Sequence, residues 1–292
     1  EIVSMATRES DSLLRCVVPT KSYNLPREGK IQASLRITWV NGAEIENDNA
    51  QVTIYSCSKM AQGDCSLCKS YEESLHYLCR WCDSPLNCEY RDHCLTTRAV
   101  TMCPPPQVEK VTPLKGHYLG GTYVTITGRN LGAKFKDIQH NTSIAGVACT
   151  PVEELYEPAR RIVCRLNQSN AGCKTGPVSV LNKIFAQFQF KYMKPILSMV
   201  SPPKRAVSGG ALLTLHGKPI YLGTTIAIQV NRKICNITNK TESEVECILP
   251  ASSIGSAELS VTIDGNEIQR NMSGSTTFTY VDDPTITGIS PL

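Results

Sequence analysis

Short stretches in which apolar and polar residues alternate recur along the whole chain. Two of them are GTYVTITG (121–128) and GALLTLHG (210–217). Alternation with a period of two is typical of a strand with one buried face. Nearer the start, SLRITWV (34–40), a turn-forming stretch and AQVTIYSC (50–57) show the same pattern, so we expect two strands joined by a turn there. The chain is therefore predicted to be mostly β.

An internal repeat sets the organisation. The stretches VEKVTP, ILSMVSP and ITGISP end at Pro113, Pro202 and Pro291, each 89 residues after the one before. A Gly-Gly pair follows the first two prolines at the same distance, at 120–121 and 209–210, where we expect a bend with positive φ before a strand. A unit of this length is too long for a solenoid repeat and fits a compact β-sandwich of about 100 residues.

The repeat predicts the boundaries of the units. We expect one sandwich over residues 104–193, a second over 194–281 and the start of a further one over 282–292. Residues 1–56 are interpreted as the C-terminal part of a similar sandwich, with Cys16 at the place of the second cysteine of a repeat. Between this segment and the first full repeat lies a cysteine-rich module, residues 57–103.

Cysteines and glycosylation motifs indicate the compartment. The chain holds fourteen cysteines, more than a reduced cytosolic domain of this size usually carries without a metal or catalytic role. It also has N-x-S/T motifs, the acceptor sites of N-glycans, at Asn141, Asn167, Asn236, Asn239 and Asn271. Together they indicate an extracellular chain. Since EIVSMATRES lacks the apolar core of a signal peptide, we expect a fragment of a larger mature protein.

Each full repeat carries one cysteine pair in the same relative region. The pairs are Cys149 with Cys164 and Cys235 with Cys247. A disulfide closing a loop of this size stabilises a fold by about 3 kcal/mol in the chain-entropy model. The alternative is a pair of free buried thiols, which an oxidising compartment disfavours. Cys173 has no evident partner.

The cysteine-rich module is too short to build an adequate apolar core, so covalent bridges are expected to replace it, with Trp81 packed among them. Its eight cysteines are Cys57, Cys65, Cys68, Cys79, Cys82, Cys88, Cys94 and Cys103. Their spacing alone does not determine how they pair. The alternative is a structural zinc site on the two C-x-x-C pairs, which leaves four cysteines unexplained.

No motif predicts catalysis, a cofactor or a metal. The histidines form no H-x-x-x-H pattern, and His117, in a glycine-rich turn, is expected to be a solvated loop residue. Asp282 and Asp283 alone make a poor Ca²⁺ site. The net charge is +4 with interspersed signs, so nucleic-acid binding has no support, and no apolar run approaches the roughly 18 residues of a membrane span. Binding of a glycosaminoglycan would require basic residues gathered on one face. The basic residues considered are scattered along the sequence: Arg27, Lys30, Lys204, Arg205, Lys233 and Lys240.

The order of these features resembles a known family. C-x7-C-x2-C, then Cys79-Arg80-Trp81-Cys82, then the last three cysteines of the module, resembles the PSI (plexin–semaphorin–integrin) module. The repeats, with GHYLGGTYVTITGRNLG after VTP, resemble IPT domains, which are Ig-like sandwiches shared by plexins and certain transcription factors. Sandwich tail, PSI module and successive IPT domains together resemble the plexin ectodomain stalk over essentially the whole chain, in particular its third PSI module with the third and fourth IPT domains.

The resemblance carries several expectations. It implies a non-enzymatic extracellular segment of a single-pass cell-surface receptor, without a cofactor or membrane insertion of its own. Its partners would be a semaphorin, bound by an N-terminal propeller outside this chain, and a second receptor or a co-receptor. The segment would space and orient that head and transmit ligand-induced dimerisation. The PSI resemblance implies the disulfide pairs Cys57–Cys79, Cys65–Cys103, Cys68–Cys88 and Cys82–Cys94.

Three alternatives remain open at this point. A sandwich face could engage a co-receptor or a glycosaminoglycan directly. The chain could instead be the stalk of a scatter-factor receptor tyrosine kinase, although such receptors have one PSI module directly after the propeller, whereas here a sandwich tail precedes it. An intracellular DNA-binding IPT protein is a weaker alternative, because the chain has glycosylation motifs and no basic stripe.

Overall fold

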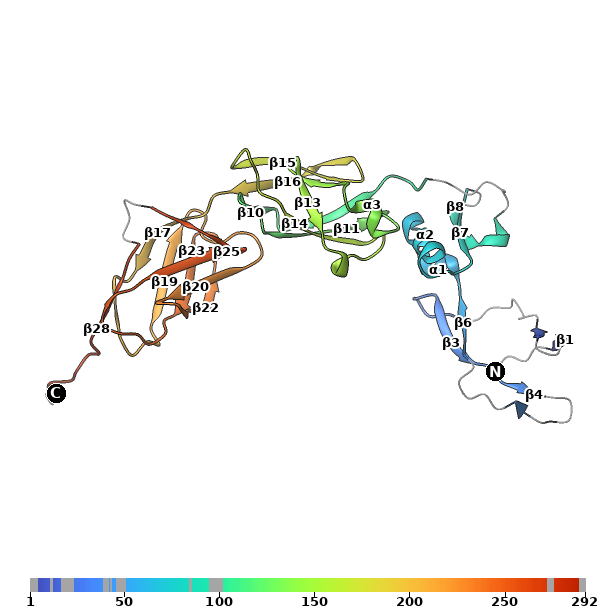
Figure 1. The fold of residues 1–292 in the computed structure, drawn as a ribbon, viewed down its shortest axis with the longest axis horizontal. Helices are drawn as coiled ribbons and strands as arrows, with labels where there is room; N and C mark the ends of the chain where they lie inside the picture. The colour runs from blue at the N-terminus through green and yellow to red at the C-terminus, as the bar shows by residue number, and fades with distance from the viewer. Residues whose placement is uncertain are drawn as a thin grey trace.

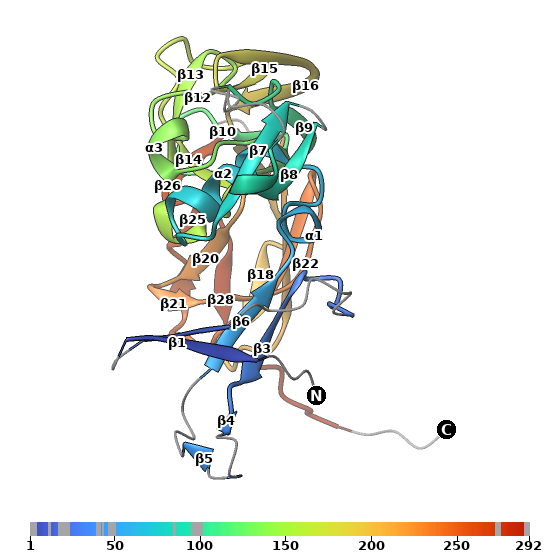
Figure 2. The same ribbon diagram turned by 90° about the vertical axis from the view of Figure 1, so that its right-hand side faces the viewer.

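The chain forms an elongated arch of successive small units (Figure 1). The computed structural model describes residues 5–10, 13–16, 24–38, 42, 44–45, 51–83, 86–94, 102–271 and 276–288. Viewed along the long axis, the N-terminal hairpins and the second sandwich both lie below the first sandwich (Figure 2). The structure is mostly β, as the alternating pattern predicts, and its helices are short. None of those in the described ranges is long and apolar enough to cross a membrane.

The N-terminal segment consists of antiparallel strand pairs. They are β1 (Ala6–Ser10) with β2 (Leu13–Cys16), β3 (Lys30–Ser34) with β6 (Gln51–Tyr55), and β4 (Ile37–Thr38) with β5 (Glu44–Ile45). The expected hairpin between 34–40 and 50–57 is therefore wrong in its first strand. The register that forms places Ile31 opposite Ile54 and Ala33 opposite Val52, so apolar residues face each other across the pair. Residues 39–40 of the expected strand lie outside the described residues.

The cysteine-rich module begins directly after β6. It consists of α1 (Cys57–Ala61), α2 (Cys65–Glu73), β7 (Cys79–Asp83), β8 (Leu86–Tyr90) and the 3₁₀ turn η1 (Arg91–His93). Each α-helix has a side-chain N-cap, because Ser56 Oγ accepts from Lys59 N and Asp64 Oδ1 accepts from Leu67 N. Strands β7 and β8 form an antiparallel pair beside the helices.

Bridges and one large ring form the core of this module. Trp81 is 4% exposed and packs in one cluster with buried cysteines of the module. The structure joins the cysteines as Cys57–Cys79, Cys65–Cys103, Cys68–Cys88 and Cys82–Cys94. These are the pairs that the PSI resemblance implies, and they leave no thiolate of either C-x-x-C pair for a zinc ion.

The first sandwich follows from residue 106 onward. Its elements are β9 (Gln107–Thr112), β10 (Lys115–His117), β11 (Tyr123–Arg129), α3 (Phe135–Ile138), β12 (Thr142–Ile144), β13 (Val147–Pro151), η2 (Glu153–Leu155), β14 (Arg161–Leu166), β15 (Lys174–Val180) and β16 (Lys183–Met193). The strand order is β10-β16-β15-β12-β13-β14-β11-β9, in which β13 bridges two layers. Ile126, Phe190 and Tyr192 are fully buried between them, and Cys149 is joined to Cys164.

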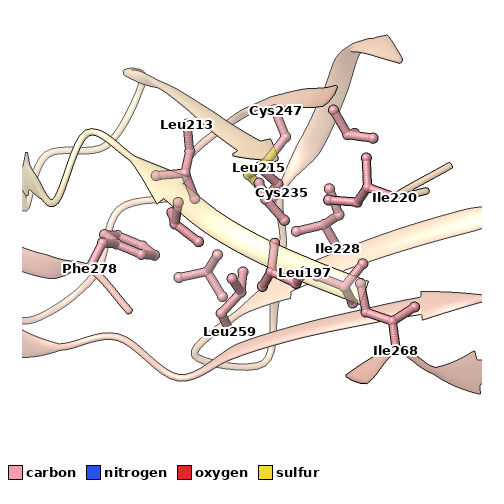
Figure 3. Packing of buried hydrophobic residues seen from close by; sticks show 14 of the residues in the cluster. Leu197, Leu213, Leu215, Ile220, Ile228, Cys235, Cys247, Leu259, Ile268 and Phe278 are labelled. Atoms are coloured by element: carbon pink, nitrogen blue, oxygen red, sulfur yellow. A yellow bond between two sulfur atoms is a disulfide. The ribbon is translucent and has the colours of Figure 1, made fainter. Parts of the chain in front are cut away.

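The second sandwich repeats this plan. Its strands are β17 (Ile196–Ser201), β18 (Lys204–Ala206), β19 (Leu212–Gly217), β20 (Ile226–Val230), β21 (Lys233–Ile234), β22 (Asn236–Lys240), β23 (Glu244–Ile248), β24 (Gly255–Ser256), β25 (Leu259–Ile263), β26 (Asn266–Glu267), β27 (Gln269–Arg270) and β28 (Thr279–Val281). Sheet β22-β23-β19-β17-β27 faces sheet β21-β20-β25-β26. Leu215 and Leu259 both belong to the buried cluster between them, and Leu215 lies beside the Cys235–Cys247 disulfide (Figure 3).

We expect Trp81→Ala to destabilise the cysteine-rich module by about 3–5 kcal/mol, because a large buried ring is removed from a core that has few other side chains. Thermal unfolding of the secreted protein measures the loss. Leu86→Ala is the control, since Leu86 is 66% exposed on the neighbouring strand. Equal melting temperatures for the two variants would show that the ring does not support the module.

Candidate functional site

In the part of the chain that the structure describes, the hydrogen bonds of two buried carboxylates lie between successive units rather than in a cleft. Within those residues no group of three or more His, Cys, Asp or Glu side chains could hold a metal ion. Two junctions instead are organised around a buried aspartate. We call them the Asp64 joint, between the cysteine-rich module and the first sandwich, and the Asp264 joint, between the two sandwiches.

The Asp64 joint is a reciprocal exchange of hydrogen bonds. Asp64 is fully buried, and while its Oδ1 caps α2, its Oδ2 accepts from the main-chain N–H of Asn130, 2.9 Å away. Asn130 returns the interaction, because its Oδ1 accepts from Cys65 N at 3.0 Å and from Ser66 N at 3.2 Å. The helix N-terminus thus receives one carboxylate from its own unit and one amide oxygen from the next, which satisfies donors that a helix start otherwise leaves free.

Local sequence explains why these two residues can meet. Aspartate is among the preferred N-cap residues, and Asp64 stands directly before the helical stretch. Asn130 follows β11 and has φ of 54°, the left-handed region that asparagine tolerates better than most residues. The turn after β11 therefore aims both the N–H and the side-chain oxygen of Asn130 at the helix start.

Weaker contacts surround this exchange. Lys134 Nζ lies 2.7 Å from Glu73 Oε2, and Arg160 Nη2 donates to Gln62 Oε1 at 3.4 Å. Arg129 donates to the main-chain oxygen of Gln62. Exposed ion pairs contribute little to stability, so the buried exchange is the main directional contact of the joint.

The Asp264 joint also depends on a buried aspartate, but here the aspartate belongs to the later of the two units along the chain, whereas Asp64 belongs to the earlier one. Asp264 lies in the tight turn between β25 and β26 and is 9% exposed. Its carboxylate accepts from Thr225 N at 2.7 Å and Thr224 N at 3.0 Å in its own sandwich. Its Oδ2 also accepts from Thr122 Oγ1 of the first sandwich at 2.6 Å. One carboxylate therefore holds both units.

Backbone contacts complete this joint. Tyr123 N donates to Thr224 Oγ1 at 3.0 Å and Thr224 Oγ1 donates to Tyr123 O at 3.1 Å, while Asn266 Nδ2 donates to Gly120 O at 2.9 Å. Gly121 has φ of +88°, and a Cβ there would stand 2.4 Å from the main-chain oxygen of Asp264. Only glycine allows the two backbones to approach this closely.

His117 belongs to this joint and corrects one expectation. It is 1% exposed at the end of β10, not a solvated loop residue, because the turn that follows hydrogen-bonds back to it and its ring stacks on Tyr118. Its Nδ1 accepts from Leu119 N at 3.1 Å. Burial lowers the pKa of His117, and the negative charge of Asp264 opposes that effect.

The residues that the sequence analysis singled out do not converge on one site. Cys173 carries an exposed free thiol, and the side chain of Cys16 lies outside what is described. The glycosylation motifs are spread over both sandwiches: the side chains of Asn167, Asn236, Asn239 and Asn271 are exposed and that of Asn141 is half-buried. Asp283 Oδ1 accepts from Ser208 N at 3.2 Å.

The basic residues are distributed as well. Arg27 and Lys30 lie in the N-terminal segment. In the second sandwich Lys204 and Arg205 lie on β18, Lys233 on β21 and Lys240 on β22. Lys233 Nζ donates to Ala251 O, and Lys240 lies over the ring of Tyr221.

Sequence reasoning missed the two aspartates of the joints. A signal existed for Asp64, because an Asp directly before a helical stretch marks an N-cap. The Asp264-Gly265 pair is a hairpin-turn signal, and Gly120-Gly121 was expected to form a bend. None of these patterns indicates a contact with another unit.

Comparison with known proteins agrees with this architecture. The IPT/TIG domain family matches residues 106–192 and 195–280. Human plexin-A2 is 27% identical over 304 residues, and zebrafish plexin A3 is 30% identical over 306 residues. Each alignment covers 98% of this chain but 16% of the relative. The solved extracellular region of plexin A4 superposes with a TM-score of 0.71 at 27% identity, covering 99% of this chain and 26% of that one.

Tandem Ig-like sandwiches behind a disulfide-bridged module define a multidomain extracellular array. The chain belongs to the IPT/TIG domain family, and over nearly its whole length it is homologous to a part of the plexin extracellular region.

We expect Asp264→Asn to loosen the junction between the sandwiches. The carboxylate now accepts from Thr122 Oγ1, Thr224 N, Thr225 N and Thr225 Oγ1. The amide group would turn a donor toward at least one of these four groups, and a buried donor left unsatisfied costs about 1–3 kcal/mol. Hydrogen exchange at Thr224 and Thr225 and small-angle scattering measure the change. Asp282→Asn, at an exposed position, is the control. Unchanged protection at both threonines would contradict the assignment.

The Asp264 joint should also lose stability in mild acid. The lowered pKa of His117 means that the unfolded chain takes up a proton below about pH 6.5 while the folded chain resists it, so the free energy of unfolding falls as the pH drops through that value. Unfolding curves between about pH 7.5 and 5.5 measure the slope. His117→Asn keeps an acceptor for Leu119 N without titrating and should flatten the slope. His140→Gln, at an exposed position, should leave the slope as it is.

Proposed function

We propose that this chain is a non-enzymatic stalk segment of a plexin-type semaphorin receptor. In this proposal it spaces and orients a ligand-binding head above the membrane and transmits ligand-induced dimerisation. The observation that supports the proposal most directly is that neighbouring units share buried hydrogen bonds at both the Asp64 and the Asp264 joint. A segment that only tethered its neighbours would not need such contacts.

The joints resist bending for a physical reason. Opening either one would exchange a hydrogen bond between a carboxylate and a donor in the next unit for hydrogen bonds to water, and a hydrogen bond to a charged group contributes about 1.5–3 kcal/mol net. The connections add stiffness, since only residues 194–195 separate β16 from β17 and three consecutive prolines, 104–106, precede the first sandwich. The arch of Figure 1 is then a preferred shape rather than one of many.

The partners follow from the plexin homology as proposals. A semaphorin would bind a propeller domain outside this chain, and the stalk would engage a second receptor or a co-receptor only through its placement. N-glycans are proposed at the five acceptor asparagines, four of which have exposed side chains. The chain would lie on the extracellular side of a single-pass receptor.

The proposal can be tested in the complete receptor at the cell surface. Asp64→Ala with Asp264→Ala should leave semaphorin affinity close to normal, because no ligand contact is changed, but should reduce the ligand-induced response. Asp282→Ala with Asp83→Ala is the matched control, since both side chains are exposed. Equal surface levels must be verified by antibody.

Charge reversals distinguish the stalk from a direct binding module. Lys204→Glu and Lys233→Glu should be tolerated, because both are exposed surface positions. Abolished binding of ligand, co-receptor or heparin with intact folding would replace the stalk proposal by the binding-module alternative.

A further inference from the structure

The end of the second sandwich repeats the geometry with which the first sandwich receives its neighbour. Six hydrogen bonds around the glycine pair have counterparts about one repeat further on. In the first sandwich they are Tyr118 N–Met193 O, Gly120 N–His117 O, Gly121 N–Leu166 O, Leu166 N–Thr122 O, Ser169 N–Tyr118 O and Tyr192 Oη–Asn167 O. Their counterparts in the second sandwich, in the same order, are Val207 N–Val281 O, Gly209 N–Ala206 O, Gly210 N–Leu249 O, Leu249 N–Ala211 O, Ser252 N–Val207 O and Tyr280 Oη–Pro250 O.

What differs is the space above the glycine. A Cβ on Gly121 would meet the backbone of the second sandwich, whereas Gly210, with a similar φ of +75°, has no atom within 4 Å of its Cβ position. The left-handed backbone that allows a close approach is therefore present at Gly210 without anything approaching it. Beside it, Leu212 and Ile248 lie opposite each other on β19 and β23 and are 47% and 38% exposed.

We propose that the surface around Gly210, Ala211, Leu212 and Ile248, the Gly210 surface, is the docking site of a β-turn from a following IPT domain. The third copy of the repeat motif, ITGISP, begins at residue 286, just after β28. Val207 N donates to Val281 O and Ser208 N to Asp283 Oδ1, so the chain leaves the second sandwich beside this surface. The chain leaves the first sandwich in the same way, beside Gly121.

The chemistry of this joint differs from that of the Asp264 joint. Ala211 stands where the first sandwich has Thr122, so no hydroxyl is available to bind an incoming carboxylate. The opposed pair Tyr123 and Arg165 is replaced by Leu212 and Ile248. The incoming turn is therefore expected to present a small or apolar residue in place of an aspartate. Because apolar contact is not directional, this joint should allow more angular freedom than the Asp264 joint. The inference rests on the repeat and holds whether the chain is a stalk or a binding module.

The test uses the chain extended through the following repeat. Gly210→Ala is compared with Gly172→Ala, which has a similar φ of +70° and equally open space, so both variants carry the same backbone strain. Distances between spin labels on the second sandwich and the following repeat are measured by pulsed electron resonance. Gly210→Ala should broaden the distance distribution at least twofold, and Gly172→Ala should not.

Leu212→Ser gives a second reading that involves no glycine strain, and it should broaden the same distribution. If neither Gly210→Ala nor Leu212→Ser changes the distances, the proposal is overturned. Two other occupants would also overturn it. A shift from dimer to monomer for Leu212→Ser in sedimentation would show that a second copy covers the surface. A broadening seen only after removal of the glycan at Asn236, which pairs with Ile248 across β22 and β23, would show that the glycan covers it.

Discussion

A carboxylate removed from water is stable only where hydrogen-bond donors surround it, and this constraint organises the molecule. At Asp64 and Asp264 the donors come from two units at once, so neither unit alone provides the full set. The joint therefore has one geometry in which all groups are satisfied. A purely apolar contact of similar area would permit many small rotations, because burial of apolar surface has no preferred direction.

The joints depend on rigid units, and the disulfides supply that rigidity. The cysteine-rich module has few apolar side chains besides Trp81, and its helix α2 is tied by Cys65 and Cys68 to distant parts of the same module. Since Asp64 directly precedes Cys65, the bridge fixes the helix start that Asn130 binds. The disulfides thus fix the position of the helix start within its unit, and the hydrogen bonds between units fix that unit relative to the next.

The two sandwiches share one main-chain conformation around the glycine pair and differ in the side chains beside it. Both sandwiches have a glycine pair held by corresponding main-chain hydrogen bonds, before β11 in one and before β19 in the other, but the residue after the pair is Thr122 in the first and Ala211 in the second. A single hydroxyl decides whether a neighbouring carboxylate can be received there. Stiffness can in this way vary from joint to joint while the sandwich fold stays constant.

Much of the architecture was determined by the sequence alone. Alternation with a period of two, the 89-residue spacing and the density of cysteines each depend only on residues near one another or on regular recurrence, so the β class, the repeated sandwich and the bridged module could be predicted. The tertiary structure decided the rest. Strand β6 pairs with 30–34 because that register sets Ile31 against Ile54. His117 is buried because the turn that follows it hydrogen-bonds back to its ring and its main-chain oxygen. Thr122 and Asp264 are 142 residues apart, and only the packing of two folded units brings a hydroxyl and a carboxylate into hydrogen-bond distance, which no local pattern encodes.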